Sequence, residues 1–153
     1  HRCWTWMKST LCWGASTAMS EILTFLDAGV LLSAARNASP HRLKALALLA
    51  DARRKFVTTD FVKLETTLKC DYHGYQQQLE FYEDFFANAA VFLADVAAIV
   101  AGAYRVGKQY GLNAMDALHI SSALLAQADE FVTTERPNSP FQNVKGLKIL
   151  SLH

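Results

Sequence analysis

The stretch "NAMDALHISSALLAQADEFVTTERPNSPF", residues 113–141, places a helix pattern, a strand pattern and two acids in one short run. Asn113 is a residue type favoured at helix N-caps, and the pattern after it predicts a helix over 114–127. The run "EFVTT", residues 130–134, is rich in aromatic and β-branched residues and predicts a strand. Asp116 lies in the first turn of the expected helix, and Glu135 directly follows the expected strand.

The same alternation of strands and helices extends over the rest of the chain. Further strands are expected at "ILTFL" (22–26), "KFVTT" (55–59), "VFLA" (91–94) and "LKILSL" (147–152). Helices are expected from Pro40 with Ser39 as N-cap, over 60–69 with Phe61, Leu64 and Leu68 on one side, and over 75–89 and 95–111. This order predicts an α/β fold of three layers, α/β/α, with a central and mostly parallel sheet of about five strands.

Composition indicates one globular domain. The chain has 153 residues, of which 52% are hydrophobic and 19% charged, and its formal net charge is +1. This charge argues against a surface that is basic throughout and coats nucleic acid, although a local basic patch remains compatible with it. Residues 1–18 hold all three tryptophans and show no helical or strand period, so we expect a non-native or disordered N-terminal extension. The single folded domain is expected over 19–153.

Cysteine usage and hydropathy indicate the compartment. Cys3, Cys12 and Cys70 are odd in number and lack the spacing of metal ligands, which favours reduced thiols in a cytoplasmic protein. No uncharged apolar run has the roughly 18–20 residues of a membrane span, so no membrane association is expected.

Four acids occur where they can reach one edge of the predicted sheet. Asp27 ends the first strand, Glu65 lies about two turns into the helix after the second, and Asp116 and Glu135 flank the fourth strand. Ligands of open α/β sheets bind beyond the carboxyl ends of the strands. Carboxylates gathered there repel one another unless a cation lies among them, and Mg²⁺ or Mn²⁺ prefers such oxygen ligands.

Each acid also has an ordinary interpretation, and spacing alone does not establish that the four converge. Asp116 is favourably placed near the positive end of its helix, while Glu65 and Glu135 suit a solvated helix face and a turn. Asp27 is harder to explain in this way because apolar runs flank it on both sides. His119 follows Asp116 by three residues on one helix face, which suits either a packed residue or one that assists a metal or substrate.

Residues 22–152 resemble the PIN domain family of metal-dependent nucleases, in particular its VapC-like ribonucleases. The matching segments are "FLDAGVLL", "DFVKLE", "NAMDALHISSAL" and "FVTTE". The resemblance implies that Asp27, Glu65, Asp116 and Glu135 occupy the family's acidic positions, which bind the metal and carry the catalysis. It also implies supporting positions for Thr133 and His119.

The resemblance implies a function and partners as well. The expected protein is a Mg²⁺- or Mn²⁺-dependent endoribonuclease that hydrolyses phosphodiester bonds in RNA, and it is the toxin of a toxin–antitoxin pair with an antitoxin protein as partner. PIN-like domains often pair, so a homodimer is expected. Aromatic residues at helical spacing favour either the core or the dimer contact: Tyr72, Tyr75, Phe81, Tyr82, Phe85 and Phe86.

Three departures from the family pattern keep an alternative function open. A hydroxyl residue and often Asn follow the family's first acid, where this chain has Ala28 and Gly29, and the last acid is usually Asp, where this chain has Glu135. These residues favour a catalytically weakened PIN-like module that binds RNA or protein. An unrelated small-molecule or phosphatase-like α/β enzyme is the third hypothesis.

Overall fold

The computed structural model describes residues 20–153 and places five strands, six α-helices and one 3-10 helix in that range. The strands are β1 (Ile22–Leu26), β2 (Arg54–Thr58), β3 (Val91–Phe92), β4 (Glu130–Thr133) and β5 (Lys148–Ser151). The helices are α2 (Ala28–Ala35), α3 (Arg42–Leu49), α4 (Asp60–His73), α5 (Gln76–Asn88), α6 (Val96–Tyr110), α7 (Ala114–Leu125) and η1 (Pro140–Asn143). The extension expected over 1–18 lies outside the described residues.

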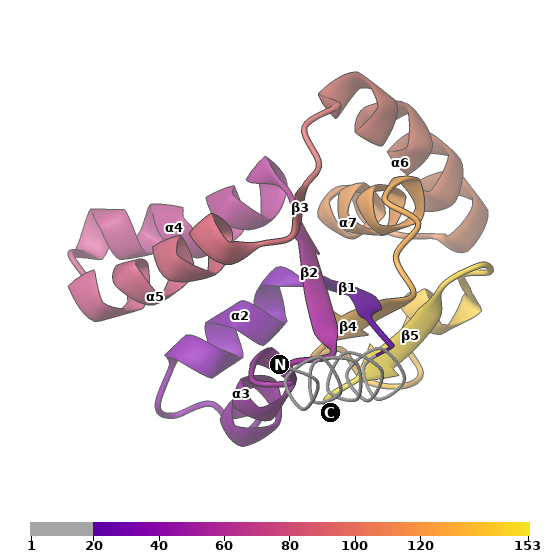
Figure 1. Ribbon diagram of the computed structural model, residues 1–153. Coiled ribbons are helices and arrows are strands. Elements are labelled where there is room, and N and C mark those ends of the chain that lie inside the picture. The colour runs from indigo at the N-terminus through magenta and orange to yellow at the C-terminus, as the bar shows by residue number, and fades with distance from the viewer. Residues whose placement is uncertain (1–19) are drawn as a thin grey trace, which may run out of the picture.

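All strand pairs are parallel, and the sheet has the order β3-β2-β1-β4-β5. The chain moves from β1 outward to β3 and then crosses back to β4 on the other side of β1. Right-handed crossovers therefore place α2 to α5 on one face and α6 and α7 on the other, as Figure 1 shows. The expected three-layer α/β/α fold is confirmed. The order reverses between β1 and β4, and their carboxyl ends form the edge where such folds bind ligands.

Aromatic rings fill the core behind β1 and β4. Phe25 and Phe131 are stacked with ring centroids 5.5 Å apart, and Phe141 packs against Phe131 at 5.2 Å. At the amino end of the same strands, buried Glu130 accepts hydrogen bonds from Arg54 at 2.6 Å and from Thr24 at 2.9 Å. This pairing satisfies a buried charge far along the strand from the carboxyl edge. No helix in residues 20–153 has the length and hydropathy needed to cross a membrane.

Two helices differ from the expectations. Helix α2 was not predicted because its sequence, "AGVLLSAA", is almost entirely apolar and shows no polar face. Helix α3 begins at Arg42 rather than at Pro40, and His41 takes the N-cap position. The Ser39 hydroxyl accepts a hydrogen bond from the His41 N–H at 3.3 Å, a local turn that replaces the expected cap.

Helix α4 packs through a different face from the apolar one in its sequence. The residues that face the core are Val62, Thr66 and Cys70, and the Thr66 hydroxyl donates a hydrogen bond to the Val62 carbonyl at 3.0 Å. Leu64 and Leu68 are 51% and 59% exposed. Because the Thr66 hydroxyl is hydrogen-bonded within the helix, this polar side chain can lie in the interior. The opposite side of the helix, with Leu64 and Leu68, then faces outward.

Candidate metal centre

Asp27 lies at the junction between β1 and α2, at the carboxyl edge of the sheet. Its N–H donates to the carbonyl of Val132 on the neighbouring strand at 2.9 Å, and its own carbonyl accepts from Val30 in the first turn of α2. The parallel register pairs Leu26 with Val132, so the next residues, Asp27 and Thr133, come side by side. The backbone thus fixes an acid that is only 9% exposed.

Thr133 orients the carboxylate of Asp27. Its hydroxyl donates to Asp27 Oδ2 at 3.0 Å and accepts from the backbone N–H of Glu135 at 3.1 Å. The Thr133 contact occupies Oδ2 of Asp27, and Oδ1 is directed toward His119. Thr133, predicted as a supporting residue, is in direct contact with Asp27.

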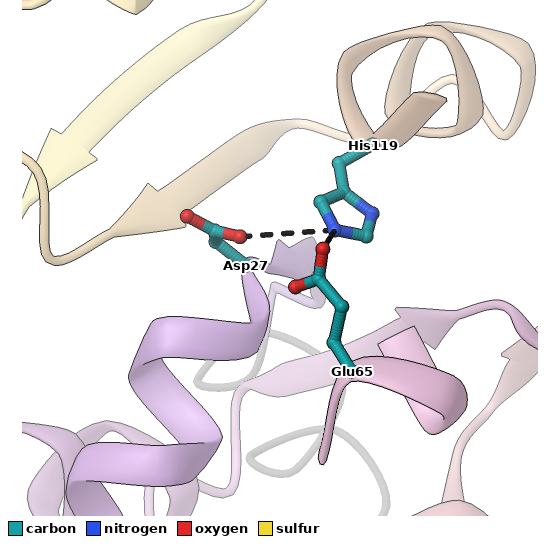
Figure 2. Close-up of side chains that lie close together, drawn as sticks. All are labelled: Asp27, Glu65 and His119. Atoms are coloured by element: carbon teal, nitrogen blue, oxygen red, sulfur yellow. Dashed lines mark ion pairs between the residues drawn. The ribbon is translucent and has the colours of Figure 1, made fainter. Parts of the chain in front are cut away.

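Glu65 from α4 and His119 from α7 complete a compact group with Asp27. One ligand atom of each of the three residues lies within 4.8 Å of the others. His119 Nε2 is 3.3 Å from Glu65 Oε1 and 3.9 Å from Asp27 Oδ1, and Figure 2 shows both carboxylates directed at this ring nitrogen. Two predicted acids therefore meet at one point, and the histidine stands beside them.

Burial of His119 is nearly complete. The side chain is 1% exposed, and its ring packs against Phe25 with centroids 5.9 Å apart. Neither Nδ1 nor Nε2 has a hydrogen-bond partner in residues 20–153. In the sequence, the spacing of three from Asp116 and the resemblance single out this residue, but neither distinguishes packing from ligation.

Asp116 lies beside this group but is not one of the three residues that meet within 4.8 Å. The Asn113 side chain caps α7 by accepting the Asp116 N–H at 3.0 Å, as the sequence predicts for this residue pair. Burial and, next, the Asp27 carboxylate raise the pKa of Asp116 from 3.8 to about 6. Glu135 and Glu65 contribute in the same direction, while His119 opposes them. Asp116 thus shares the electrostatic field of the site.

Glu135 lies on the loop after the strand, as expected. It is two residues beyond the end of β4 and is exposed. Its side chain and that of Asp116 line a hollow of about 290 Å³ between the α6–α7 turn and the segment that leads into η1. The Thr133 hydroxyl accepts the Glu135 N–H and so holds the backbone of Glu135 at this edge.

The donor set fits a divalent cation. Burial raises the pKa of Asp27, and the nearby Glu65 carboxylate adds to this, whereas His119 and the Thr133 hydroxyl oppose it. Two carboxylates in close contact, one of them buried, are unfavourable without a compensating positive charge. His119 Nε2, which has no hydrogen-bond partner in the described residues, adds a nitrogen atom at the same point.

The structure explains one departure from the family pattern. A Cβ atom at Gly29 would lie 2.5 Å from Thr134 Oγ1, so a side chain at this position collides with Thr134 unless the threonine moves. Thr134 follows Thr133 directly in the chain. Gly29 therefore accommodates the segment that carries the Thr133 contact, and it does not by itself indicate a degraded site.

Comparisons with known proteins agree with this fold. The family model described as PIN domain matches residues 24–142. VapBC2 from Rickettsia felis, bound to a DNA fragment from its promoter, superposes with a TM-score of 0.64 at 16% identity, over 85% of this chain and 98% of that one.

Two further solved structures share the fold. A toxin–antitoxin complex from Klebsiella pneumoniae gives a TM-score of 0.64 at 13% identity, over 85% of this chain and 98% of that one. VapC20 from Mycobacterium tuberculosis, a toxin that cleaves the sarcin–ricin loop, gives 0.59 at 14% identity, over 71% and 86%. A comparison with curated proteins gives no match.

Proposed function

The chain belongs to the PIN domain family, and from this premise we propose that it is a divalent-metal-dependent endoribonuclease. The observation that carries the proposal is the meeting of Asp27, Glu65 and His119 within 4.8 Å at the carboxyl edge of the sheet. Asp116 adds a further carboxylate to the same field. Packing of the core does not require these acids to lie together, whereas metal-dependent hydrolysis of a phosphodiester does.

The proposed metal residues are Asp27, Glu65 and Asp116, with Glu135 as the outermost acid. A bound Mg²⁺ or Mn²⁺ ion supplies a Lewis acid for the phosphate and lowers the pKa of a bound water. The protein's part is to fix the ligands: Thr133 holds Asp27 through Oδ2, the Asn113 cap holds the start of α7, and α4 presents Glu65. The carboxylates hold charge at the site and are not required to take the proton themselves.

The proposed substrate is RNA, and the proposed biological role is that of a toxin inhibited by an antitoxin protein. Support comes from the structural neighbours, since VapC20 is a toxin that cleaves the sarcin–ricin loop and the Klebsiella pneumoniae structure is a toxin–antitoxin complex. The buried thiol of Cys70 is compatible with the proposed cytoplasmic location.

A homodimer is the proposed assembly. Two helices carry exposed apolar stripes at a spacing of four residues: Leu64, Leu68 and Tyr72 on α4, and Val96, Val100 and Tyr104 on α6. Stripes of this kind are unusual on a monomer and are typical of interaction surfaces. A second copy of the chain is the occupant that we propose, because PIN-like domains often pair.

The test is cleavage of single-stranded RNA with Mg²⁺, with Mn²⁺ and with a chelator. The variants are Asp27→Asn, Asp116→Asn and the control Asp71→Asn, whose carboxylate is exposed on α4. We expect metal-dependent cleavage by wild type and Asp71→Asn, and rates lower by about 10²-fold or more for the two site variants. Equal rates for all four proteins contradict the proposed site. RNA binding without metal-dependent cleavage in the wild type supports the weakened binding module instead.

A further inference from the structure

We infer that His119 is a direct ligand of the metal ion through Nε2, and that the site consequently binds Mn²⁺ more tightly than Mg²⁺. The inference rests on the proposed function in that both need a metal at this edge of the sheet. The inference goes beyond the proposed function in two ways. It assigns a nitrogen ligand to a site otherwise built from carboxylates, and it ranks the divalent ions by their affinity for the site.

The first support is the state of the imidazole. A buried polar atom normally has a hydrogen-bond partner, and leaving one without costs about 1–3 kcal/mol. His119 is 1% exposed, yet neither ring nitrogen has a hydrogen-bond partner in the described part of the chain, and Nε2 has only its ion-pair contacts with Glu65 and Asp27. A ring held in the core only for packing against Phe25 would not need its nitrogens. An ion at Nε2 satisfies that nitrogen and places the proton on Nδ1, which has no acceptor among the described residues, so the ion accounts for one of the two nitrogens.

The second support is the position of the two carboxylates relative to Nε2. Donor atoms that share one ion at about 2.1 Å each lie roughly 3–4 Å apart. The distances from Nε2 to Glu65 Oε1 and Asp27 Oδ1 are 3.3 and 3.9 Å, and neither contact is a hydrogen bond. The three atoms come from three different elements, α4, α7 and the β1–α2 junction, and Figure 2 shows them directed at a common point.

The third support is the orientation of Asp27. The Thr133 hydroxyl binds Oδ2, which leaves Oδ1 free on the side that faces His119 and Glu65. The carboxylate is therefore held with one oxygen toward the imidazole rather than with both oxygens away from it. Ligand orientation by such a partner is typical of metal sites.

A nitrogen ligand changes which ions the site prefers. Mg²⁺ takes oxygen ligands almost exclusively and retains its waters, whereas imidazole suits first-row transition ions. We expect affinities to increase from Mg²⁺ to Mn²⁺ and again to Co²⁺, in the order in which these ions bind nitrogen.

The decisive experiment is pulsed electron paramagnetic resonance of the RNA-free protein loaded with Mn²⁺. A directly bound imidazole gives a nitrogen coupling to the Mn²⁺ spin, and the wild-type protein alone decides whether such a ligand is present. His119→Phe keeps the size of the ring without its nitrogens, and His119→Asn is a smaller second variant. His73→Asn, at an exposed position of α4, is the matched control.

We expect the nitrogen coupling in wild type and His73→Asn and its loss in both His119 variants. Calorimetry should show Mn²⁺ affinity lowered by about tenfold or more in His119→Phe, and Mg²⁺ affinity lowered much less. Removing a residue that only hydrogen-bonds to a metal ligand already lowers affinity by about this factor. A wild-type spectrum without nitrogen coupling, or a coupling that persists in His119→Phe, overturns the inference. Nitrogen coupling in a protein that does not cleave RNA upholds the inference and rejects the proposed nuclease.

Discussion

At the scale of single residues, the Thr133 hydroxyl is the contact that positions the first acid. Thr133→Val keeps the shape but removes the donor to Asp27 and the acceptor for the Glu135 N–H. Mn²⁺ affinity, measured by calorimetry, should fall about 10–100-fold, because partners that orient metal ligands contribute about this much. Thr133→Ser retains the hydroxyl and should remain within a few-fold of wild type. Equal losses in the two variants would mean that the methyl group, and not the hydroxyl, supports the site.

The raised pKa of Asp116 predicts a pH dependence of the metal-free protein. A carboxyl whose pKa is about 6 in the folded state and 3.8 in the unfolded chain takes up protons on folding between these values. The free energy of unfolding should therefore decrease as pH rises from about 4 to about 6 and stay lower above that. In the presence of a chelator, Asp116→Asn should melt at a higher temperature than wild type at pH 7, and the difference should vanish near pH 4.

The control for this experiment is Asp71→Asn, which removes an exposed carboxylate from α4. It should follow the wild-type melting curve at each pH. If Asp116→Asn is no more stable than wild type at pH 7, repulsion among the acids does not destabilise the metal-free protein.

The sequence indicates the edge of the sheet at which the acids lie, because residues after parallel strands share one edge. Asp27 and Glu65 could be placed together on this basis. The role of His119 could not, since a histidine three residues after an acid has the same pattern whether its nitrogens are partnered or not. The part of Glu135 in the site stays a prediction, because its carboxylate lies on the exposed loop after β4 and no contact with the other ligands fixes it.

At the scale of elements, the contact between α6 and α7 depends on Gly102. A Cβ atom there would lie 2.2 Å from Ser121 Oγ, which is buried and donates to the Ile99 carbonyl at 2.7 Å. Gly102→Ala gains about 1 kcal/mol of helix propensity, but overpacking costs about 1–3 kcal/mol. We expect a net loss of stability in chemical denaturation.

A double-mutant cycle tests whether the contact with Ser121 causes this loss. In a Ser121→Gly background the obstructing side chain is absent, so Gly102→Ala should become neutral or stabilising. An unchanged loss in both backgrounds would locate the strain elsewhere in α6.

Elements with a polar face were predictable from the sequence, and elements without one were not. Helix α6 has a clear apolar side and was expected over 95–111, close to its observed bounds. Helix α2 lies between other elements and needs no polar side, so its sequence carries no helical period. In α4 the apolar stripe is genuine but faces outward, because burial depends on the neighbouring helices and not on the stripe itself.

At the scale of the whole molecule, the exposed stripes on α4 and α6 predict the oligomeric state. The double variant Leu64→Glu with Leu68→Glu places charge on the α4 stripe and should convert a dimer to a monomer in light scattering. Leu43→Glu is the control, since Leu43 is 79% exposed on α3 and belongs to neither stripe. A wild-type protein that is monomeric at micromolar concentration rejects the proposed dimer.

The strand order also sets when the site can exist during synthesis of the chain. β4 pairs with β1 across a long sequence interval, and Asp27 receives its hydrogen bond from a residue 106 positions later. At about 5–20 residues per second, roughly 5–20 s pass on the ribosome between the two. An emerging chain carries Asp27 and Glu65 well before it can assemble the site. The topology thus prevents the proposed site from forming before β4 has been made.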